Sequence, residues 1–306
     1  MDRREFIKRG AAIGFGAGLY FLPKGLRTAA NLAAQESGYP DLVALKGASP
    51  AVMFDRGIKT LGGMGRFVKN GQTVVLKPNM SWDLAPEYGA NTSPDLVAAV
   101  VKHCKDAGAR RVIVMDHAID NWESSGKNSG VLTAALRAGA IHAPAEREGY
   151  YHAVTIDRGK RLKETMIHES LLECDVLINI PVLKHHGGAG LTGSIKNLMG
   201  CVWNRRFYHS SGLNTCMADF LFAKKPDLNI VDAYRVITRN GPRGGSLDAV
   251  AQMGALIISP DIVAADTAAS MLLGRKQGEV EPVRLAAEAG FGQIDLSKLN
   301  ISRLTV

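Results

Sequence analysis

The chain alternates short, almost fully apolar runs with longer stretches in which apolar residues recur at helical spacing. The apolar runs are rich in β-branched and aliphatic residues and are bounded by Gly, Asn, Asp or Pro. Strands of this kind are typical of parallel sheets that are buried on both faces. We expect strands at residues 73–77, 111–116, 175–183, 227–232 and 256–259, and a weaker strand at 152–156.

Helices are expected between these strands. Ser93 and Pro94 suit an N-cap and a first helical turn, and Gly108 suits the end of the same helix. Ser259-Pro260 repeats this start, and Gly274 provides the stop. The expected helices cover residues 93–107, 130–138, 164–174, 260–273 and 281–289. The alternation predicts an α/β fold: a mostly parallel sheet covered by helices on both faces, with Rossmann-like layering.

The N-terminus has the pattern of an export signal. Arg3-Arg4 is followed by Phe6, Lys8 and an apolar stretch over residues 11–22, which is typical of the twin-arginine type. This stretch is shorter than the roughly 20 residues that span a bilayer. We expect a signal at 1–34 and a single α/β domain at 35–306, with 35–60 as a lead-in and an insertion near 201–227. A basic helix in a cytoplasmic protein is the alternative.

The signal predicts periplasmic localisation. The twin-arginine machinery would export the protein already folded, and contact with the membrane would be limited to the signal segment. Residues 1–34 hold six Lys/Arg and two Asp/Glu, so they carry +4 of the formal net charge of +8. The remaining +4 is spread over the rest of the chain without a basic run interleaved with aromatics. We therefore expect no nucleic-acid partner.

The four cysteines form no Cys-x-x-Cys pair. The sequence thus has no iron–sulfur cluster motif and no zinc ribbon motif. Buried free thiols are the favoured interpretation, and a disulfide between Cys201 and Cys216, the closest pair in sequence, stays open. The cofactor is unknown; a divalent metal held by His and carboxylates fits the residue types better than a thiolate-bound one.

Polar and ionisable residues gather after the expected strands. Parallel sheets bind ligands beyond the carboxyl ends of their strands, so these residues are expected to meet at one edge. Buried Lys in particular needs partners, which makes it poor core material. The candidate substrate-binding residues are Lys77, Asn79, Asp116, Lys196, Asn197 and Asp232. The candidate catalytic residues are Lys184, His185 and His186, which precede a glycine-rich loop at 187–193.

These residue types suit an anionic ligand. Lys and Asn donate to phosphate or carboxylate, and a His oriented by Asp can act as general acid and base or as a metal ligand. The glycine-rich loop resembles an anion-cradling loop that leads into a helix, although it does not have the P-loop pattern. We expect a small anionic ligand as partner.

Several motifs resemble the domain-of-unknown-function family numbered 362. They are Lys77-Pro78-Asn79, Thr92-Ser93-Pro94, 179–185, 195–200, Asp219, Val231-Asp232, 241–244, Ser259-Pro260-Asp261 and Ala265-Asp266. The resemblance runs from about residue 40 to the C-terminus, and the signal places the chain with the exported, twin-arginine subgroup. Some members carry an added ferredoxin-like segment and look like iron–sulfur proteins; this sequence has no such cysteine cluster, so the resemblance does not imply that role. The resemblance implies no reaction.

Two main hypotheses follow. The first is a periplasmic enzyme that acts on a phosphate or carboxylate substrate, by proton removal next to a carboxylate or by hydrolysis, with or without a metal. The second is a non-catalytic binding or maturation protein for a metal or a redox partner, related to iron–sulfur members but without their cluster cysteines. An electron-transfer protein that relies on Cys201 and Cys216 is a weaker third.

Overall fold

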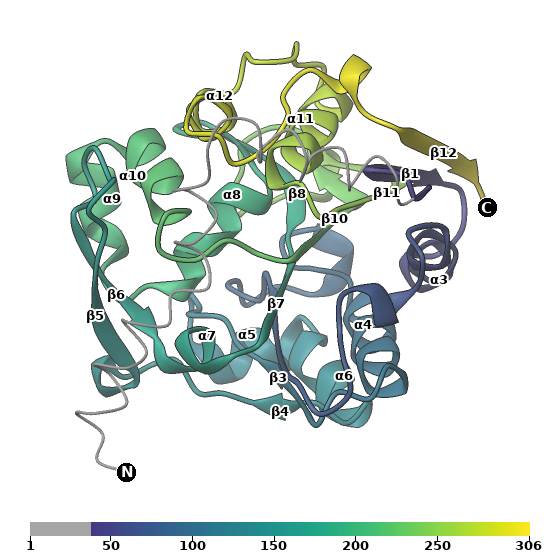
Figure 1. Cartoon of the computed structure of the whole chain (residues 1–306), viewed down its shortest axis with the longest axis horizontal. Coiled ribbons are helices and arrows are strands. Elements are labelled where there is room, and N and C mark those ends of the chain that lie inside the picture. The colour runs from purple at the N-terminus through teal and green to yellow at the C-terminus, as the bar shows by residue number, and fades with distance from the viewer. Residues whose placement is uncertain (1–37) are drawn as a thin grey trace. The chain divides into compact units, whose positions relative to one another are not determined.

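A computed structural model describes residues 38–306, and the unit from Pro40 to Val306 is built on one large sheet (Figure 1). The expected export signal at 1–34 lies outside the described residues. The strands are β1 Leu42–Lys46, β2 Thr73–Pro78, β3 Arg111–Val114, β4 Ile141–His142, β5 Tyr151–Thr155, β6 Glu164–His168, β7 Val176–Ile180, β8 Val182–His186, β9 Gly190–Thr192, β10 Leu228–Ile237, β11 Val250–Ser259 and β12 Ile301–Thr305.

The α-helices alternate with these strands through much of the chain. They are α3 Pro50–Thr60, α4 Pro94–Asp106, α5 Trp122–Asn128, α6 Val131–Arg137, α7 Glu169–Glu173, α8 Ser194–Asn197, α9 Arg205–Ser211, α10 Leu213–Phe220, α11 Ile262–Leu272 and α12 Glu281–Glu288. Within the described residues, no helix is both long enough and apolar enough to cross a membrane.

The large sheet has the strand order β12-β1-β11-β10-β7-β2-β3-β4, and β8 and β9 branch from β10. From β10 through β7, β2 and β3 to β4, every neighbouring pair is parallel. β11 is antiparallel to both β10 and β1. The predicted α/β fold with a mostly parallel sheet is therefore confirmed, with an antiparallel β11 that the sequence pattern did not indicate.

Helices cover both faces of the sheet, as predicted. Val74 and Leu76 point into a core shared with α3, α4 and α6, whereas Val75 points into a second core. This second core contains residues of α8, α10, α11 and α12. Two helix layers around a central sheet are visible in Figure 1, with α11 and α12 on one side and α3, α4 and α6 on the other. Alternate strand residues point to opposite faces, which explains the continuous apolar runs.

Three predicted elements were wrong in detail. The expected helix at 164–174 is β6 followed by the short α7, because 164–168 pairs with β5 as an antiparallel ribbon. The expected strand at 175–183 divides at Pro181 into β7 and β8, which is consistent with the missing N–H of proline. The expected strand at 227–232 continues as β10 to Ile237, with a bulge between Ala233 and Arg235.

Residues 42–60, expected as a lead-in, belong to the core of the fold. β1 lies between β11 and β12, and the buried Met53, Phe54 and Ile58 of α3 pack onto the sheet.

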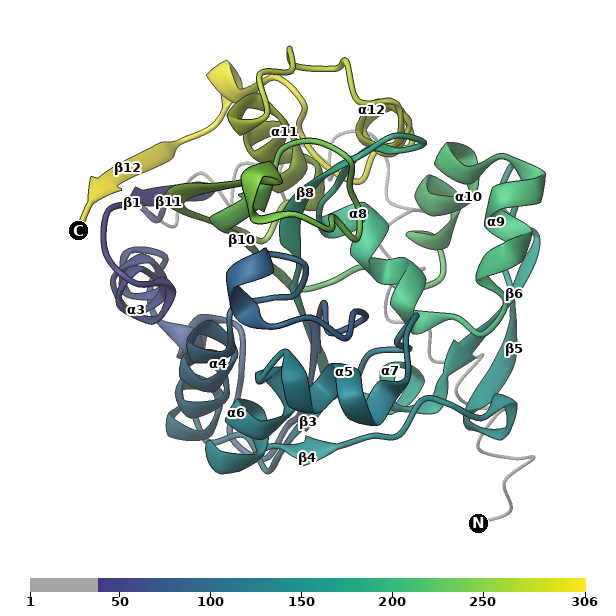
Figure 2. The same ribbon diagram turned by 180° about the vertical axis from the view of Figure 1, so that it is seen from behind.

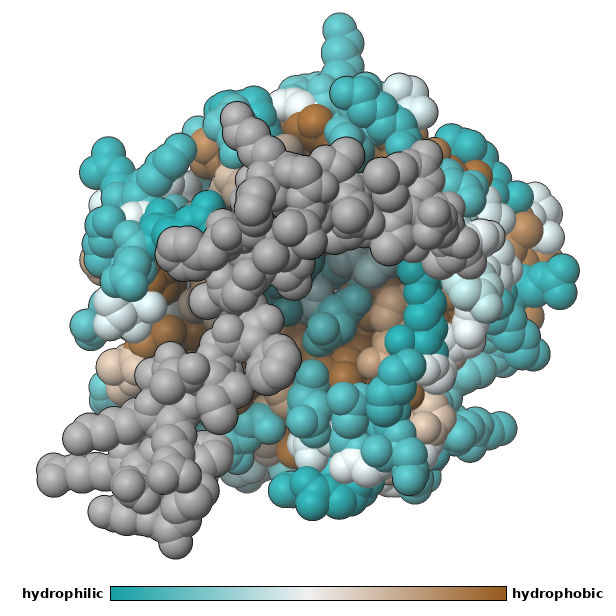
Figure 3. Space-filling model, in the orientation of Figure 1, coloured by the Kyte–Doolittle hydropathy of each residue, from teal (hydrophilic) through white to brown (hydrophobic). Residues whose placement is uncertain are grey.

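The face of the molecule seen in Figure 3 is mostly hydrophilic along its rim, and hydrophobic residues are visible nearer its centre.

Candidate functional site

The candidate site lies where β2, β3 and β7 end and α8 covers the edge of the sheet. β2 and β7 are in register so that Lys77 lies beside Asn179 and Pro78 beside Ile180. Seen from behind, in Figure 2, α5 and α8 lie in front of the sheet on this side. The predicted convergence of strand ends therefore holds for β2, β3 and β7.

An ion pair between Lys77 and Asp116 forms the base of the site. Lys77 Nζ lies 2.7 Å from Asp116 Oδ1, and the two side chains are 1% and 0% exposed. Lys77 Nζ also donates to the Pro78 carbonyl at 2.9 Å and to Asn197 Oδ1 at 3.0 Å. Lys77 thus donates two hydrogen bonds in addition to the ion pair, while Asp116 Oδ1 accepts no hydrogen bond among the described residues.

Asp116 fixes the chain that follows β2. Its Oδ2 accepts hydrogen bonds from the Met80 amide at 2.8 Å and from the Ser81 hydroxyl at 2.9 Å. Gly200 packs directly against the ion pair, because a Cβ built there would meet Asp116 Oδ1 and the end of the Lys77 side chain. The ion pair thus joins β2, β3 and the segment that follows α8.

Buried asparagines connect α8 with the sheet. Asn197 Nδ2 donates to the Lys77 carbonyl at 3.0 Å and to Asn179 Oδ1 at 2.9 Å, while Asn79 Nδ2 donates to Asn197 Oδ1 at 3.3 Å. Asn179 Nδ2 in turn donates to Asn229 Oδ1 at 3.2 Å and to the Ser194 carbonyl at 2.8 Å. The network runs from β2 through β7 to β10. Asn79 Oδ1 is buried and has no hydrogen-bond partner among the described residues.

Asp266 of α11 holds the start of α8. Its Oδ1 accepts from the Ser194 amide at 2.5 Å and its Oδ2 from the Ile195 amide at 2.9 Å. Burial raises the pKa of this carboxyl to about 6, and the bonds from the amides oppose that rise. Two otherwise unsatisfied helical amides are paired in this way, so Asp266 sets the position of Lys196 and Asn197.

Lys184 is fully buried beside this network. Its Nζ donates to the Ala90 carbonyl at 2.6 Å and lies 5.9 Å from the centre of the Trp82 ring. Burial, and after it the charge of Lys196, lowers the Lys184 pKa well below its ordinary value. The charge of this amine is therefore disfavoured in the folded protein.

Lys196 is partly exposed as a residue, as Arg205 is, but its ammonium group is largely buried. Its only hydrogen-bond contact is with Met199 Sδ at 3.8 Å, and it takes part in none of the ion pairs found in residues 38–306. Burial lowers its pKa to about 8, and the charges of Arg205 and Lys77 add to this effect. An ammonium group with no carboxylate partner in such a place is unsatisfied, and an anion would satisfy it.

Arg205 brings a further positive charge from α9. Its Nη1 and Nη2 donate to the carbonyls of His117 and Ala118 at 2.7 and 3.0 Å, which tie α9 to the loop after β3. Burial lowers the pKa of Arg205, whereas the charge of Asp116 acts to raise it. A guanidinium has five N–H groups, so donors remain beyond these two.

The adjacent histidines have different surroundings. His186 Nδ1 accepts the amides of Gly188 and Ala189, both at 3.1 Å, so the remaining proton is on Nε2. Burial and the charge of Lys196 lower the His186 pKa to about 3, which keeps the ring neutral at physiological pH. His185 Nδ1 is buried and has no hydrogen-bond partner in the described chain.

The next question is whether these side chains could hold a metal ion. In the described part of the chain, no group of three or more His, Cys, Asp or Glu side chains is arranged to hold one. Metal binding through His186 Nε2 would displace its proton while the other nitrogen stays occupied by amides. The donors therefore fit an anion better than a cation.

Asp232 lies inside β10 rather than after a strand. Its Oδ2 accepts the Ser93 amide at 2.7 Å and its Oδ1 the Tyr234 amide at 3.0 Å. Burial raises its pKa, and hydrogen bonds from Ser93 oppose that rise. The carboxylate is thus engaged in holding the start of α4, and its hydrogen bonds among the described residues are to backbone amides rather than to the lysines.

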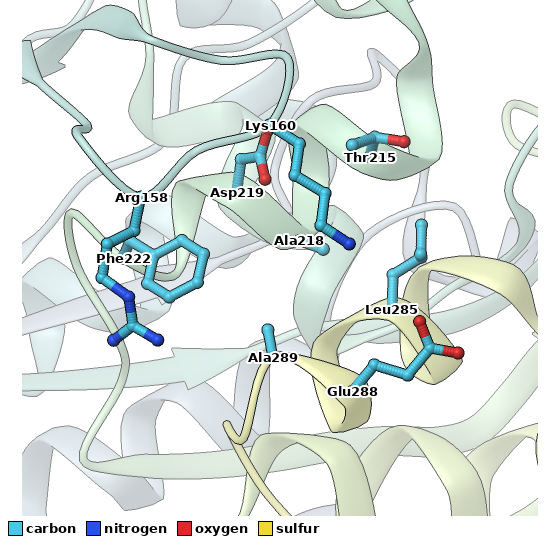
Figure 4. Close-up of a pocket in the computed structure, with 9 residues that line it drawn as sticks. All are labelled: Arg158, Lys160, Thr215, Ala218, Asp219, Phe222, Leu285, Glu288 and Ala289. Carbon is cyan, nitrogen blue, oxygen red and sulfur yellow. The ribbon is translucent and has the colours of Figure 1, made fainter.

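A separate pocket of about 250 Å³ lies between α10, α12 and the turn at 158–160. Figure 4 shows Arg158 beside Phe222 and Lys160 reaching across the pocket toward α10. None of the predicted site residues lines it.

The four cysteines, all within the described residues, are buried and free, and Cys201 and Cys216 form no disulfide.

The fold and the site together define an α/β protein with a buried, cation-rich site at the carboxyl ends of parallel strands. The family profile described as Domain of unknown function (DUF362) matches residues 74–271. The chain belongs to this family.

The chain is also similar to the thylakoid-associated protein sll1697 of Synechocystis sp., with 32% identity over 217 residues, which cover 68% of this chain and 65% of that protein. Two solved structures are more distant. The lactate racemase apoprotein of Thermoanaerobacterium thermosaccharolyticum has a TM-score of 0.48 and 13% identity, and the match covers 75% of this chain and 56% of that one. A protein of Thermotoga maritima has a TM-score of 0.49 and 12% identity, and the match covers 76% of this chain and 61% of that one. The matches span less than two thirds of these relatives' own lengths.

The sequence analysis missed several residues of the site. Asn179, Gly200 and Asp266 stand in motifs that it noted without giving these residues a role, and Asn229 carried no signal that isolated it. Buried amides and a close-packed glycine become visible only when the strands are placed side by side.

We predict that Gly200→Ala destabilises the fold by about 1–3 kcal/mol, because its Cβ overpacks the buried ion pair. Gly149→Ala is the matched control, since Gly149 is exposed and a Cβ there meets nothing within 4 Å. Urea denaturation of both variants measures the effect; equal stability of the two would contradict the packing described.

We predict that Lys77→Met costs about 3–5 kcal/mol, because it leaves the Asp116 carboxylate buried without its cation. Lys102→Met, at an exposed position of α4, is expected to change stability by less than about 0.5 kcal/mol. Combining Lys77→Met with Asp116→Asn should cost less than the sum of the two single changes in a double-mutant cycle. Additive losses would show that the pair is not coupled.

Proposed function

We propose that this protein is an enzyme that acts on a small anionic substrate, a carboxylate or a phosphate, held at Lys196. The observation that carries the proposal is the excess of positive charge at the site. Lys77, Lys196 and Arg205 act on one another's charge, and the carboxylate that opposes them, Asp116, is already paired with Lys77. A bound anion compensates the remaining charge.

The surroundings of Lys196 support this proposal. Among the groups whose pKa its charge lowers are Lys184, His186 and His209, so it stands amid positive and imidazole groups. The Nε2–H of His186 is the donor of this ring, because Nδ1 accepts two backbone amides and carries no proton. Partial burial strengthens each donor's interaction with an anion relative to bulk water.

The same proposal includes the place of action. The Arg3-Arg4 pattern supports export in folded form by the twin-arginine machinery, and hence a periplasmic protein that meets the membrane only through its signal segment. We propose no nucleic-acid partner, since the charge pattern offers no basic run. A non-catalytic binding or maturation protein is the competing proposal; it predicts stoichiometric ligand binding without product.

We predict that sulfate, phosphate and small carboxylates raise the melting temperature of the protein, because they bind the folded site. Lys196→Met should weaken their binding about tenfold to a hundredfold, which corresponds to the loss of one charge-assisted hydrogen bond. Calorimetric titration of wild type, Lys196→Met and the exposed control Lys102→Met measures this difference. Unchanged binding in Lys196→Met would sink the proposal.

The binding should depend on pH with a defined sign. Lys196 is protonated below its pKa of about 8, so affinity is highest below that pH and falls above it. A bound anion favours the ammonium form and so raises this pKa. Sulfate is the suitable probe because its own charge stays constant across the range, and Lys196→Met should lose the dependence. A wild-type affinity independent of pH would contradict the assignment.

A further inference from the structure

The pocket between α10, α12 and the turn at 158–160 has a lining of its own, separate from the site at the strand ends. Its volume of about 250 Å³ is slightly below the roughly 300–1,000 Å³ of most ligand pockets. Its apolar wall comes from the end of α10 and from α12, and charged side chains stand around this wall. A pocket of this size and lining suits a small molecule that has both an apolar and a polar part.

A buried carboxylate of α10 offers one oxygen to this pocket. Asp219 is 3% exposed, and its Oδ2 accepts the amides of Arg161 and Leu162 at 2.6 and 2.9 Å. Its Oδ1 accepts no hydrogen bond among the described residues, yet it is not one of their enclosed unpartnered atoms, so it retains accessible surface. Since Asp219 lines the pocket, Oδ1 is an acceptor open to it. The bonds at Oδ2 fix the orientation of the carboxylate before any ligand binds.

Two cations line the same pocket. The guanidinium carbon of Arg158 lies 4.4 Å from the centre of the Phe222 ring, which holds this charge against the apolar wall. Lys160 takes part in no ion pair or hydrogen bond within the described part of the chain, and Figure 4 shows its side chain reaching across the pocket. Glu288, the other acid of the lining, is already paired with Arg284. The free acceptor of the pocket is therefore accompanied by donors from two cations.

These charges select the class of ligand. A purely anionic ligand would meet the open oxygen of Asp219, and a purely cationic one would meet Lys160 and Arg158. A zwitterion avoids both conflicts, because its ammonium group can donate to the carboxylate while its own carboxylate accepts from the cations. The apolar wall, which includes Leu285 and Ala289, is then left for a hydrocarbon group.

We infer that this pocket is a binding site for a free α-amino acid with an apolar side chain. The ammonium group of the ligand donates to Asp219 Oδ1, and its carboxylate accepts from Lys160 and Arg158. Its side chain packs against the apolar wall beside Leu285. This inference goes beyond the proposed function and does not depend on the anion site at Lys196.

The experiment is calorimetric titration of the full chain with L-valine, L-leucine and L-phenylalanine. We expect at least one of them to bind with one-to-one stoichiometry. Two analogues of that amino acid test the two charges: its amide, which lacks the carboxylate, and the corresponding carboxylic acid without the amine. Each should bind about tenfold to a hundredfold more weakly, because each loses one set of charge-assisted hydrogen bonds. Equal binding of either analogue, or no binding of all three amino acids, would overturn the inference.

Variants locate the ligand. Lys160→Met should weaken binding about tenfold, and Ala289→Phe should abolish it by filling the pocket without removing a charge. Ala289 is partly exposed, so this change tests the pocket even where Asp219→Asn disturbs the turn at 161–162. The exposed control Lys102→Met and the anion-site variant Lys196→Met should bind the amino acid as wild type does. Binding that survives Ala289→Phe and is lost in Lys196→Met would refute this pocket and leave the anion site intact.

Discussion

The Lys77–Asp116 ion pair is the interaction on which the rest of the site depends. Two charges removed from water need good geometry and further hydrogen bonds to be tolerated. Here Asp116 also binds the Met80 amide and the Ser81 hydroxyl, and Lys77 also binds Asn197. The pair therefore links β2, β3 and α8 in one arrangement, and Gly200 is needed because any side chain would enter the same space.

The asparagine network extends this arrangement without adding charge. Each amide supplies both donors and an acceptor, so Asn197 can bind β2 and β7 at the same time. Asp266 of α11 supports the same helix through the first amides of α8. Since α8 is only four residues long, these tertiary bonds rather than helix propensity hold Lys196 in place.

Much of the fold could be predicted from local pattern. The apolar run at 73–77 and the Ser93-Pro94 start give β2 and α4 directly. The pattern failed where pairing decides the outcome: residues 164–168 are a strand because β5 lies beside them, and β11 is antiparallel because of its neighbours rather than its composition. At the site, strand ends predicted the meeting of Lys77, Asn79, Asp116 and Asn197. Their roles in binding stay predictions.

The sequence could not show which lysine is free. Lys77, Lys184 and Lys196 look alike in a list of strand-end residues, and only burial and partners separate them. Lys77 is committed to an ion pair and Lys184 is enclosed, whereas Lys196 is left with a depressed pKa and no counter-ion. Burial is the main reason why charging Lys196 is costly, and the charges of Arg205 and Lys77 add to that cost. A bound anion would lower the cost, and this is the physical basis of the proposed anion site.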